Sequence, residues 1–205
     1  MASKVAICNL ALGWLGENPI TAITDPARAA QLCNANFDLL RDAVLEEGEW
    51  GFALKQAGPL APVNPGPTFG PGNLFNLPTD CLRALRCLDS SDVGSISSVF
   101  TDGMSAFPQS RLQWRREGMA VRAEVSAVYV EYIAKIEDTE LFSPGFTQAM
   151  AARLAAELSM PITNSATMFQ TMWKLYERKL RDGLNLENMQ GRQQPIRSDQ
   201  LTRVR

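Results

Sequence analysis

The chain of 205 residues contains no histidine. Histidine is the commonest general base near neutral pH and the commonest metal ligand in proteins. Its absence removes the most frequent route to acid–base catalysis and to a metal centre. The cysteines do not replace it, because no two of them have the two-residue spacing typical of zinc sites. They stand at Cys8, Cys33, Cys81 and Cys87. We expect no metal site.

The chain also lacks the segments that direct a protein to a membrane or bind a nucleotide. Its apolar amino-terminal run is too short and too interrupted to span a bilayer, and no signal, transit or lipidation motif is visible. No glycine-rich phosphate loop, dinucleotide fingerprint or nucleophile elbow occurs. We therefore expect no cofactor, no membrane partner, and reduced cysteines in the compartment where the chain is made.

Charge of one sign is not in excess either. The formal net charge is -2, which gives no global basic field for sequence-independent nucleic-acid binding. The feature closest to a catalytic set is the clustering of carboxylates in two places. The clusters are Glu46, Glu47 and Glu49, and Glu137, Asp138 and Glu140. Paired carboxylates serve glycosidases, but acidic residues are common at helix ends and turns, so we predict no catalytic residue.

The most organised stretch lies between residues 25 and 52. Asp25 and Pro26 predict the start of a long helix, and Gly48 predicts a left-handed end. One apolar stripe runs between them, made of Cys33, Phe37, Leu40 and Val44. Trp50 and Phe52 follow the helix, and we expect them to close the hydrophobic core. We expect this helix to be the spine of a bundle.

Helices are also predicted on either side of a β-rich middle. Ser3 and Gly16 bound a first helix, which makes a hairpin with the helix after residue 25. Ser143 and Pro144 begin an alanine-rich helix that ends at Pro161, and a final helix covers residues 165 to 187. The outer face of this last helix is charged, and we expect it to be solvated and salt-bridged. Its residues are Lys174, Glu177, Arg178, Lys179, Arg181 and Asp182.

The middle third predicts a loop followed by an antiparallel sheet. Residues 57 to 73 alternate prolines with glycines, so we expect no regular element there, and Phe69 is a candidate contact residue. Strands are predicted over residues 82 to 88, over a hairpin from 111 to 123, and over 125 to 136. We expect a sheet of three to five strands, with loops between residues 89 and 108.

These elements predict an α+β fold. Residues 1–57 and 139–189 form an antiparallel helical bundle, and residues 58–138 form an inserted lobe with the proline-rich loop and an antiparallel β-sheet. Residues 190–205 are polar and arginine-rich, and we expect a flexible, extended tail.

The order of these parts resembles tail tubular protein A, the head-to-tail adaptor of short-tailed bacteriophages. The likeness lies in the helix that leads into Glu49-Trp50-Gly51-Phe52, in the Leu-Pro-x-Asp-x-Leu-Arg phrase at 77 to 83, and in the paired helices from 144 to 187. The proline-rich insertion and the basic tail depart from the family pattern. The resemblance implies a structural virion protein with no catalytic residues.

The resemblance also implies partners and a place. Members of that family form a dodecameric ring beneath the portal protein, extend the DNA channel, and present a surface to the nozzle or tail tubular protein. DNA would pass through without sequence-specific binding, in a virion assembled in the host cytoplasm. We expect this chain to lie at the head–tail interface.

Three surfaces follow as hypotheses. The tail is the candidate portal-binding arm, through Arg192, Ile196, Arg197, Leu201, Arg203 and Arg205. The candidate subunit seam consists of the charges that we expect to be exposed on the long helix, which are Arg28, Arg41, Asp42 and Glu46. Phe69 is the candidate nozzle-facing residue. The alternatives are a head-completion or DNA-packaging accessory protein, which would need a cationic face, and a glycan-degrading tail component that uses Glu137 or Glu140.

Overall fold

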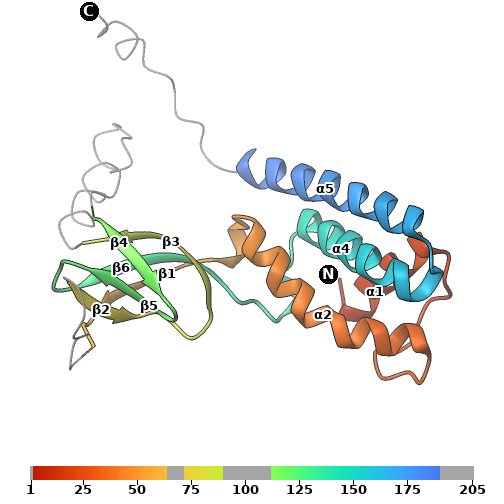
Figure 1. The fold of residues 1–205 in the computed structure, drawn as a ribbon, viewed down its shortest axis with the longest axis horizontal. Helices are drawn as coiled ribbons and strands as arrows, with labels where there is room; N and C mark the ends of the chain where they lie inside the picture. Colours follow the sequence, from red (N-terminus) through yellow and green to blue (C-terminus); the bar gives the residue numbers. More distant parts are fainter. Residues whose placement is uncertain (1, 64–71, 90–111, 190–205) are drawn as a thin grey trace, which may run out of the picture.

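The computed structural model describes residues 2–63, 72–89 and 112–189. Over these residues the fold is α+β, with four α-helices and two small antiparallel sheets. Figure 1 shows the helices gathered at one end of an elongated molecule and the strands at the other. The buried apolar side chains of the two parts form one contiguous cluster.

The first helix, α1 (Lys4–Leu15), begins and ends as its sequence predicts. The Ser3 hydroxyl accepts a hydrogen bond from the Ala6 amide at 3.1 Å, which satisfies one of the free amides of the first turn. Gly16 ends the helix in the left-handed conformation at φ 77°, where a side chain would be strained.

The long helix, α2 (Arg28–Glu47), differs from its prediction at both ends. Its amino terminus lies three residues after Asp25, whose carboxylate instead accepts from the amides of Thr21 and Ala22 and closes the preceding loop. Gly48 is extended rather than left-handed. A Cβ at Gly48 would lie 2.6 Å from Leu184 Cδ2, so close packing against the last helix explains the glycine.

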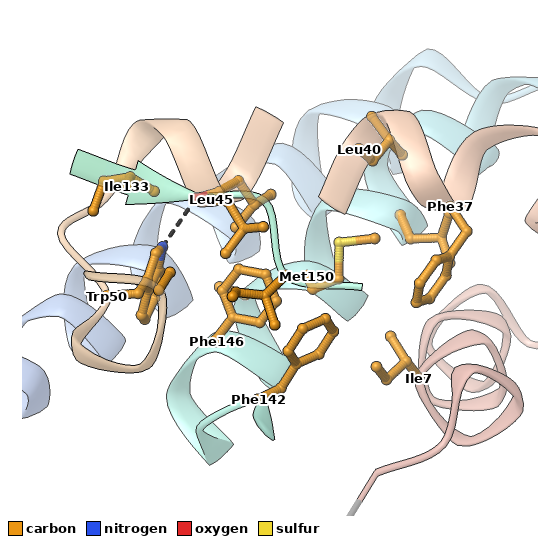
Figure 2. Close-up of a cluster of buried hydrophobic side chains, with 14 of the residues drawn as sticks. Ile7, Phe37, Leu40, Leu45, Trp50, Ile133, Phe142, Phe146 and Met150 are labelled. Carbon is orange, nitrogen blue, oxygen red and sulfur yellow. Dashed lines mark hydrogen bonds between the residues drawn. The ribbon is translucent and has the colours of Figure 1, made fainter. Parts of the chain in front are cut away.

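Trp50 closes the core as predicted, just before a short 3-10 turn, η1 (Gly51–Ala53). Its side chain is fully buried, and its indole N–H donates to the Val44 carbonyl at 2.9 Å. The Phe146 ring packs edge-on against it at 5.1 Å between centroids. Figure 2 shows these side chains together with Leu45 and with Ile133 of the last strand, so the aromatic cluster joins the bundle to the lobe.

The central helix of the bundle is α4 (Pro144–Thr163), not α2. It packs against α1, α2 and α5 (Ala166–Met189), and Figure 1 shows it between α2 and α5. The neighbouring helices can approach α4 closely because many of its buried residues are alanines with small side chains. These residues are Ala149, Ala151, Ala152, Ala155 and Ala156.

Pro161 does not end α4, which continues to Thr163 and stops at Asn164 in the left-handed conformation. The proline lies in the last turn, where it removes only one intrahelical hydrogen bond. Its own carbonyl, one of those left free at a helix end, accepts from Arg28 Nη2 at 2.8 Å. The guanidinium also places positive charge at the negative end of the helix dipole.

The lobe contains two three-stranded antiparallel sheets where one sheet was expected. The first has the order β1-β6-β3, with β1 (Leu54–Leu60), β3 (Cys81–Leu88) and β6 (Val128–Ala134). The second has the order β2-β5-β4, with β2 (Asn73–Asn76), β4 (Trp114–Glu117) and β5 (Ala120–Ala123). The chain returns to the bundle through a 3-10 turn, η2 (Thr139–Leu141).

Strand β1 was not predicted from the sequence, because its proline and glycines suggested a loop. It covers the first residues of the predicted loop and includes Gly58 and Pro59. Because β1 lies at the edge of its sheet, it can carry a proline, which would break the ladder in a central strand. The predicted hairpin is confirmed, and its turn contains Gly118 at φ 63°.

Candidate functional site

The charges predicted to form the subunit seam do not share one exposed surface. Arg41 is buried, with Nη1 3.1 Å from Asp38 Oδ1 and Nη2 2.7 Å from Asp42 Oδ1. The expectation that Arg41 is an exposed charge is therefore wrong. Moving a buried arginine away from the two carboxylates of its own helix would leave a buried charge unpaired, so Arg41 is not available to a neighbour. Arg28 is exposed, but its guanidinium already binds the end of α4.

The two other seam candidates remain accessible. Glu46 is exposed and forms no ion pair with any described residue, and Asp42 is partly exposed beside Arg41. Asp42 also lies 3.8 Å from Lys135 Nζ, which follows β6. Glu46 therefore faces solvent, and Asp42 lies near the segment that leads from β6 back to the bundle.

Of the three carboxylates in the first cluster, only Glu47 has partners among the described residues of the bundle. The Tyr176 hydroxyl donates to Glu47, and Arg153 Nη1 lies 3.9 Å from the same carboxylate. Burial and this hydrogen bond raise the pKa of Tyr176 above its usual range. Glu46 and Glu49 point to solvent and form no ion pair or side-chain hydrogen bond with the described residues.

The second carboxylate cluster has local structural roles. Lys135 Nζ lies 2.9 Å from Glu137 and lowers the pKa of that carboxyl, whereas a general acid needs a raised pKa. The Asp138 carboxylate accepts from the Glu140 amide at 2.9 Å and caps η2. This geometry gives no support to the glycosidase alternative.

Arg153 of α4 is the centre of a cluster that joins three helices. Its guanidinium lies 4.3 Å from the ring centroid of Trp173 and 5.2 Å from that of Tyr176. Nη2 lies 3.0 Å from Glu157, one turn further along α4. Cation–π contacts and ion pairs of this kind fix the helix register, so we assign this cluster to the fold.

Asp80, within the phrase that carries the family resemblance, joins three strands of the lobe. Its carboxylate accepts from Lys55 Nζ of β1 at 2.8 Å and from the Tyr132 hydroxyl of β6 at 3.1 Å. Asp80 directly precedes β3, and its backbone carbonyl accepts a hydrogen bond from the Lys135 amide at 2.7 Å. The hydrogen bond from Lys55 is the main cause that lowers the pKa of Asp80. This aspartate therefore holds the first sheet together.

A row of cations on α5 is the surface feature that the sequence interpretation missed. Lys174, Arg178 and Arg181 are exposed and form no ion pair with any residue in the described ranges. The prediction that this helix face is salt-bridged is wrong for these three side chains. Their spacings of four and three residues put them on one stripe, which is the signal that could have identified the row.

Exposed apolar side chains also occur on the bundle. Leu39 of α2 is 73% exposed, and Leu186 and Met189 are exposed near the end of α5. Single exposed leucines are common, so Leu39 alone identifies no site.

The four cysteines carry reduced thiols, and all of them are buried. Burial raises the pKa of Cys87 to about 12, so this thiol is not a nucleophile near neutral pH. No cluster of metal-ligating side chains occurs within the described part of the chain. None of the helices in that part is both long enough and apolar enough to cross a bilayer.

Several predicted contact residues lie outside the described residues. They are Phe69, Arg192, Ile196, Arg197, Leu201, Arg203 and Arg205. The loops predicted between residues 90 and 108 lie outside them as well. The portal-binding and nozzle-facing hypotheses therefore stay predictions.

The chain was compared with models of known protein families and with curated proteins, and neither comparison found a match. Its function is therefore argued from its own residues and from the resemblance in layout described above.

Proposed function

We propose that this protein is a structural adaptor that forms a ring between the portal and the tail of a short-tailed phage. The observation that carries the proposal is the division of the chain into a helical body and an inserted β lobe. The bundle is made of residues before β1 and after β6, and the lobe lies at one end of it (Figure 1). This arrangement corresponds to the part order on which the family resemblance rests.

An adaptor needs surfaces of three kinds, namely flanks toward neighbouring copies, one end toward the portal, and one end toward the tail. A helical body with a lobe at one end provides flanks and two distinct ends. Each copy in a ring contacts two neighbours through different surfaces, and such heterologous contacts close when the rotation between copies divides a full turn. The bundle flanks α2 and α5 are available for these contacts, because α4 lies between them.

The chemistry of the described residues agrees with a structural role. Glu47 and Asp80 each link neighbouring elements of the fold, and Glu137 pairs with Lys135 in the connection that follows β6. We therefore propose no catalytic role, no cofactor, and a place in the virion at the head–tail interface. DNA would pass through the ring without sequence-specific binding, and a nozzle or tail tubular protein would bind the lower surface.

The proposal is tested by light scattering and negative-stain microscopy of the purified protein, alone and with the portal protein of the same phage. We expect a ring of about twelve subunits or a complex with one copy per portal subunit. A protein that stays monomeric and does not bind the portal would contradict the proposal. Deletion of residues 191–205 should abolish portal binding, and unchanged binding in a pull-down would refute the tail hypothesis.

A further inference from the structure

Two helix faces of the bundle carry opposite charge on opposite sides of α4. The α2 face consists of Asp38, Leu39, Asp42 and Glu46, and the α5 face consists of Lys174, Arg178 and Arg181. Helix α4 packs against both helices and lies between them, so the two faces point to different sides of the same molecule (Figure 1). A single copy therefore cannot bring its own two faces together.

We propose that the α2 face of one copy binds the α5 face of the next copy, which makes this contact the subunit seam of the ring. The inference rests on the proposed ring-forming function and specifies its interface. Because the two faces differ, the contact is heterologous and propagates from copy to copy until the ring closes. It replaces the seam expected from the sequence, which included the buried Arg41.

The α5 face is suited to an acidic partner because its cations have no partner within the described part of the chain. Lys174, Arg178 and Arg181 are exposed and unpaired there, and they follow one stripe about 10 Å long at 1.5 Å per residue. Glu177 and Asp182 flank the row on either side and form no ion pair with the described residues. The charge along the centre of the stripe is therefore uniformly positive.

The α2 face presents carboxylates over a similar length. Asp38, Asp42 and Glu46 follow one another at four-residue spacing, and Asp38 keeps 63% of its side chain exposed although it contacts Arg41 and Lys4. Glu46 has no ion pair within the described ranges. Asp42 is paired with Arg41 at 2.7 Å and lies 3.8 Å from Lys135, so the free negative charge of this stripe comes from Glu46 and from the exposed side of Asp38. That negative charge opposes the cations of the α5 stripe, and the two stripes have similar lengths, which favours a second copy of this chain as the partner.

Leu39 supplies an apolar contact beside the carboxylates. It is 73% exposed and precedes Asp42 by three residues, which makes the two side chains neighbours on the surface of α2. Lysine and arginine side chains cover apolar surface with their aliphatic stems while their charged ends remain near water. The stems of Lys174 and Arg178 of the next copy can therefore cover Leu39 while their charged ends reach Asp38 and Glu46.

The test reverses the charge of each face in a separate variant and then mixes the two variants. One variant carries Asp38→Lys and Glu46→Lys, and the other carries Lys174→Glu and Arg178→Glu. Self-association is measured by sedimentation velocity at about 0.1 M salt, where the Debye length is about 10 Å. We expect each variant alone to lose at least about tenfold in apparent association constant, because two attractive pairs become repulsive.

An equimolar mixture of the two variants should restore association toward the wild-type value. In the mixture both faces of each copy meet a complementary face on the other variant, so copies alternate around the ring. Wild-type association should also weaken at about 1 M salt, where the Debye length falls to about 3 Å. Restoration by mixing is the readout that a merely destabilised variant cannot produce.

Two controls keep the test specific. Glu46→Lys alone removes no ion pair within the described residues and should weaken association without changing the helical circular dichroism. Glu17→Lys reverses an exposed carboxylate that follows α1 and belongs to neither face, and it should leave association unchanged.

Wild-type protein that does not self-associate at low salt would overturn the seam, as would face variants that associate normally or a mixture that does not recover. The adaptor function can fail separately from the seam. If the face variants still form portal-bound rings, the seam is wrong and the function stands. If the wild-type protein associates through these faces but does not bind the portal, the function is wrong and the seam stands.

Discussion

The helical bundle and the β lobe share one contiguous apolar core but differ in how their elements meet. In the bundle, buried alanines and an aromatic cluster around Trp50 and Phe146 bring helices into close contact. In the lobe, short strands are joined by ion pairs at their surfaces, such as Lys55 with Asp80 at 2.8 Å and Arg122 with Glu117 at 2.8 Å. The close contacts between its helices suit the bundle to side-by-side packing, and in the lobe we expect acid to act through these paired carboxylates.

The largest effect should come from removing the aromatic centre of the bundle. Trp50→Ala deletes a fully buried side chain and its hydrogen bond to Val44, and we expect a loss of about 3–5 kcal/mol in the free energy of unfolding. Urea denaturation measures this loss. The matched control is Trp114→Ala in β4, where the side chain is only half-buried, so the loss should be clearly smaller. Equal losses would contradict the contrast between bundle and lobe.

A smaller effect should come from adding a single methyl group where two helices touch. A Cβ at Gly145 of α4 would lie 2.9 Å from the Cα of Gly183 in α5, and backbone cannot move aside as a side chain can. We expect Gly145→Ala to destabilise the protein by about 1–3 kcal/mol.

Gly13→Ala in α1 is the control for this substitution, because a methyl group added there would have no neighbouring atom within 4 Å. The better helix propensity of alanine should leave stability unchanged or raise it by up to about 1 kcal/mol. In thermal unfolding, the midpoint temperature of Gly145→Ala should fall, whereas that of Gly13→Ala should stay the same or rise. Parallel shifts would show that α4 and α5 are not in tight contact at Gly145.

The smallest effect should appear in acid and should be confined to the lobe. Hydrogen bonds from Arg122 and Arg115 lower the pKa of Glu117 to about 2, and Lys55 lowers that of Asp80. A carboxyl whose pKa is lower in the folded state stabilises the fold above its unfolded pKa of about 4, and this stability is lost as pH falls through the folded value. Between about pH 4 and pH 2 the lobe should therefore loosen before the bundle.

Fluorine NMR of protein labelled with 5-fluorotryptophan can separate the two regions. Trp114 reports the lobe and Trp50 reports the bundle, so the Trp114 signal should change first on acidification. Glu117→Gln should remove part of that pH dependence. The Asp25 carboxyl, in the loop before α2, also has a lowered pKa, so Asp25→Asn is a control that should leave the Trp114 response unchanged. Simultaneous changes at both tryptophans would contradict the prediction.

Local signals in the sequence were sufficient where one residue determines one feature. Ser3, Gly16 and Ser143 bound their helices as predicted, and β3 and β6 follow from their apolar and β-branched residues. Strand β1 could not be predicted, because Gly58 and Pro59 are tolerated only through its edge position, which is a property of the whole sheet.

The sequence predicted the candidate surfaces less well than the fold. Periodicity places Arg41 between the apolar stripe of α2 and its polar face, and only the packed structure shows that it is buried with Asp38 and Asp42. The central position of α4 could not be predicted either. Its alanines indicate that helices can approach closely, but they do not indicate which helix has three neighbours. Likewise, four-residue spacing allows salt bridges on α5 but does not show whether they form.

The central claim is that the bundle forms the body of a ring beneath a portal. Cryo-electron microscopy of the protein bound to the portal of the same phage tests it most directly. The account predicts a closed ring with one copy per portal subunit, in which bundles contact one another side by side and α2 of each copy faces α5 of the next. A complex without a closed ring of this chain, or no complex at all, would contradict it.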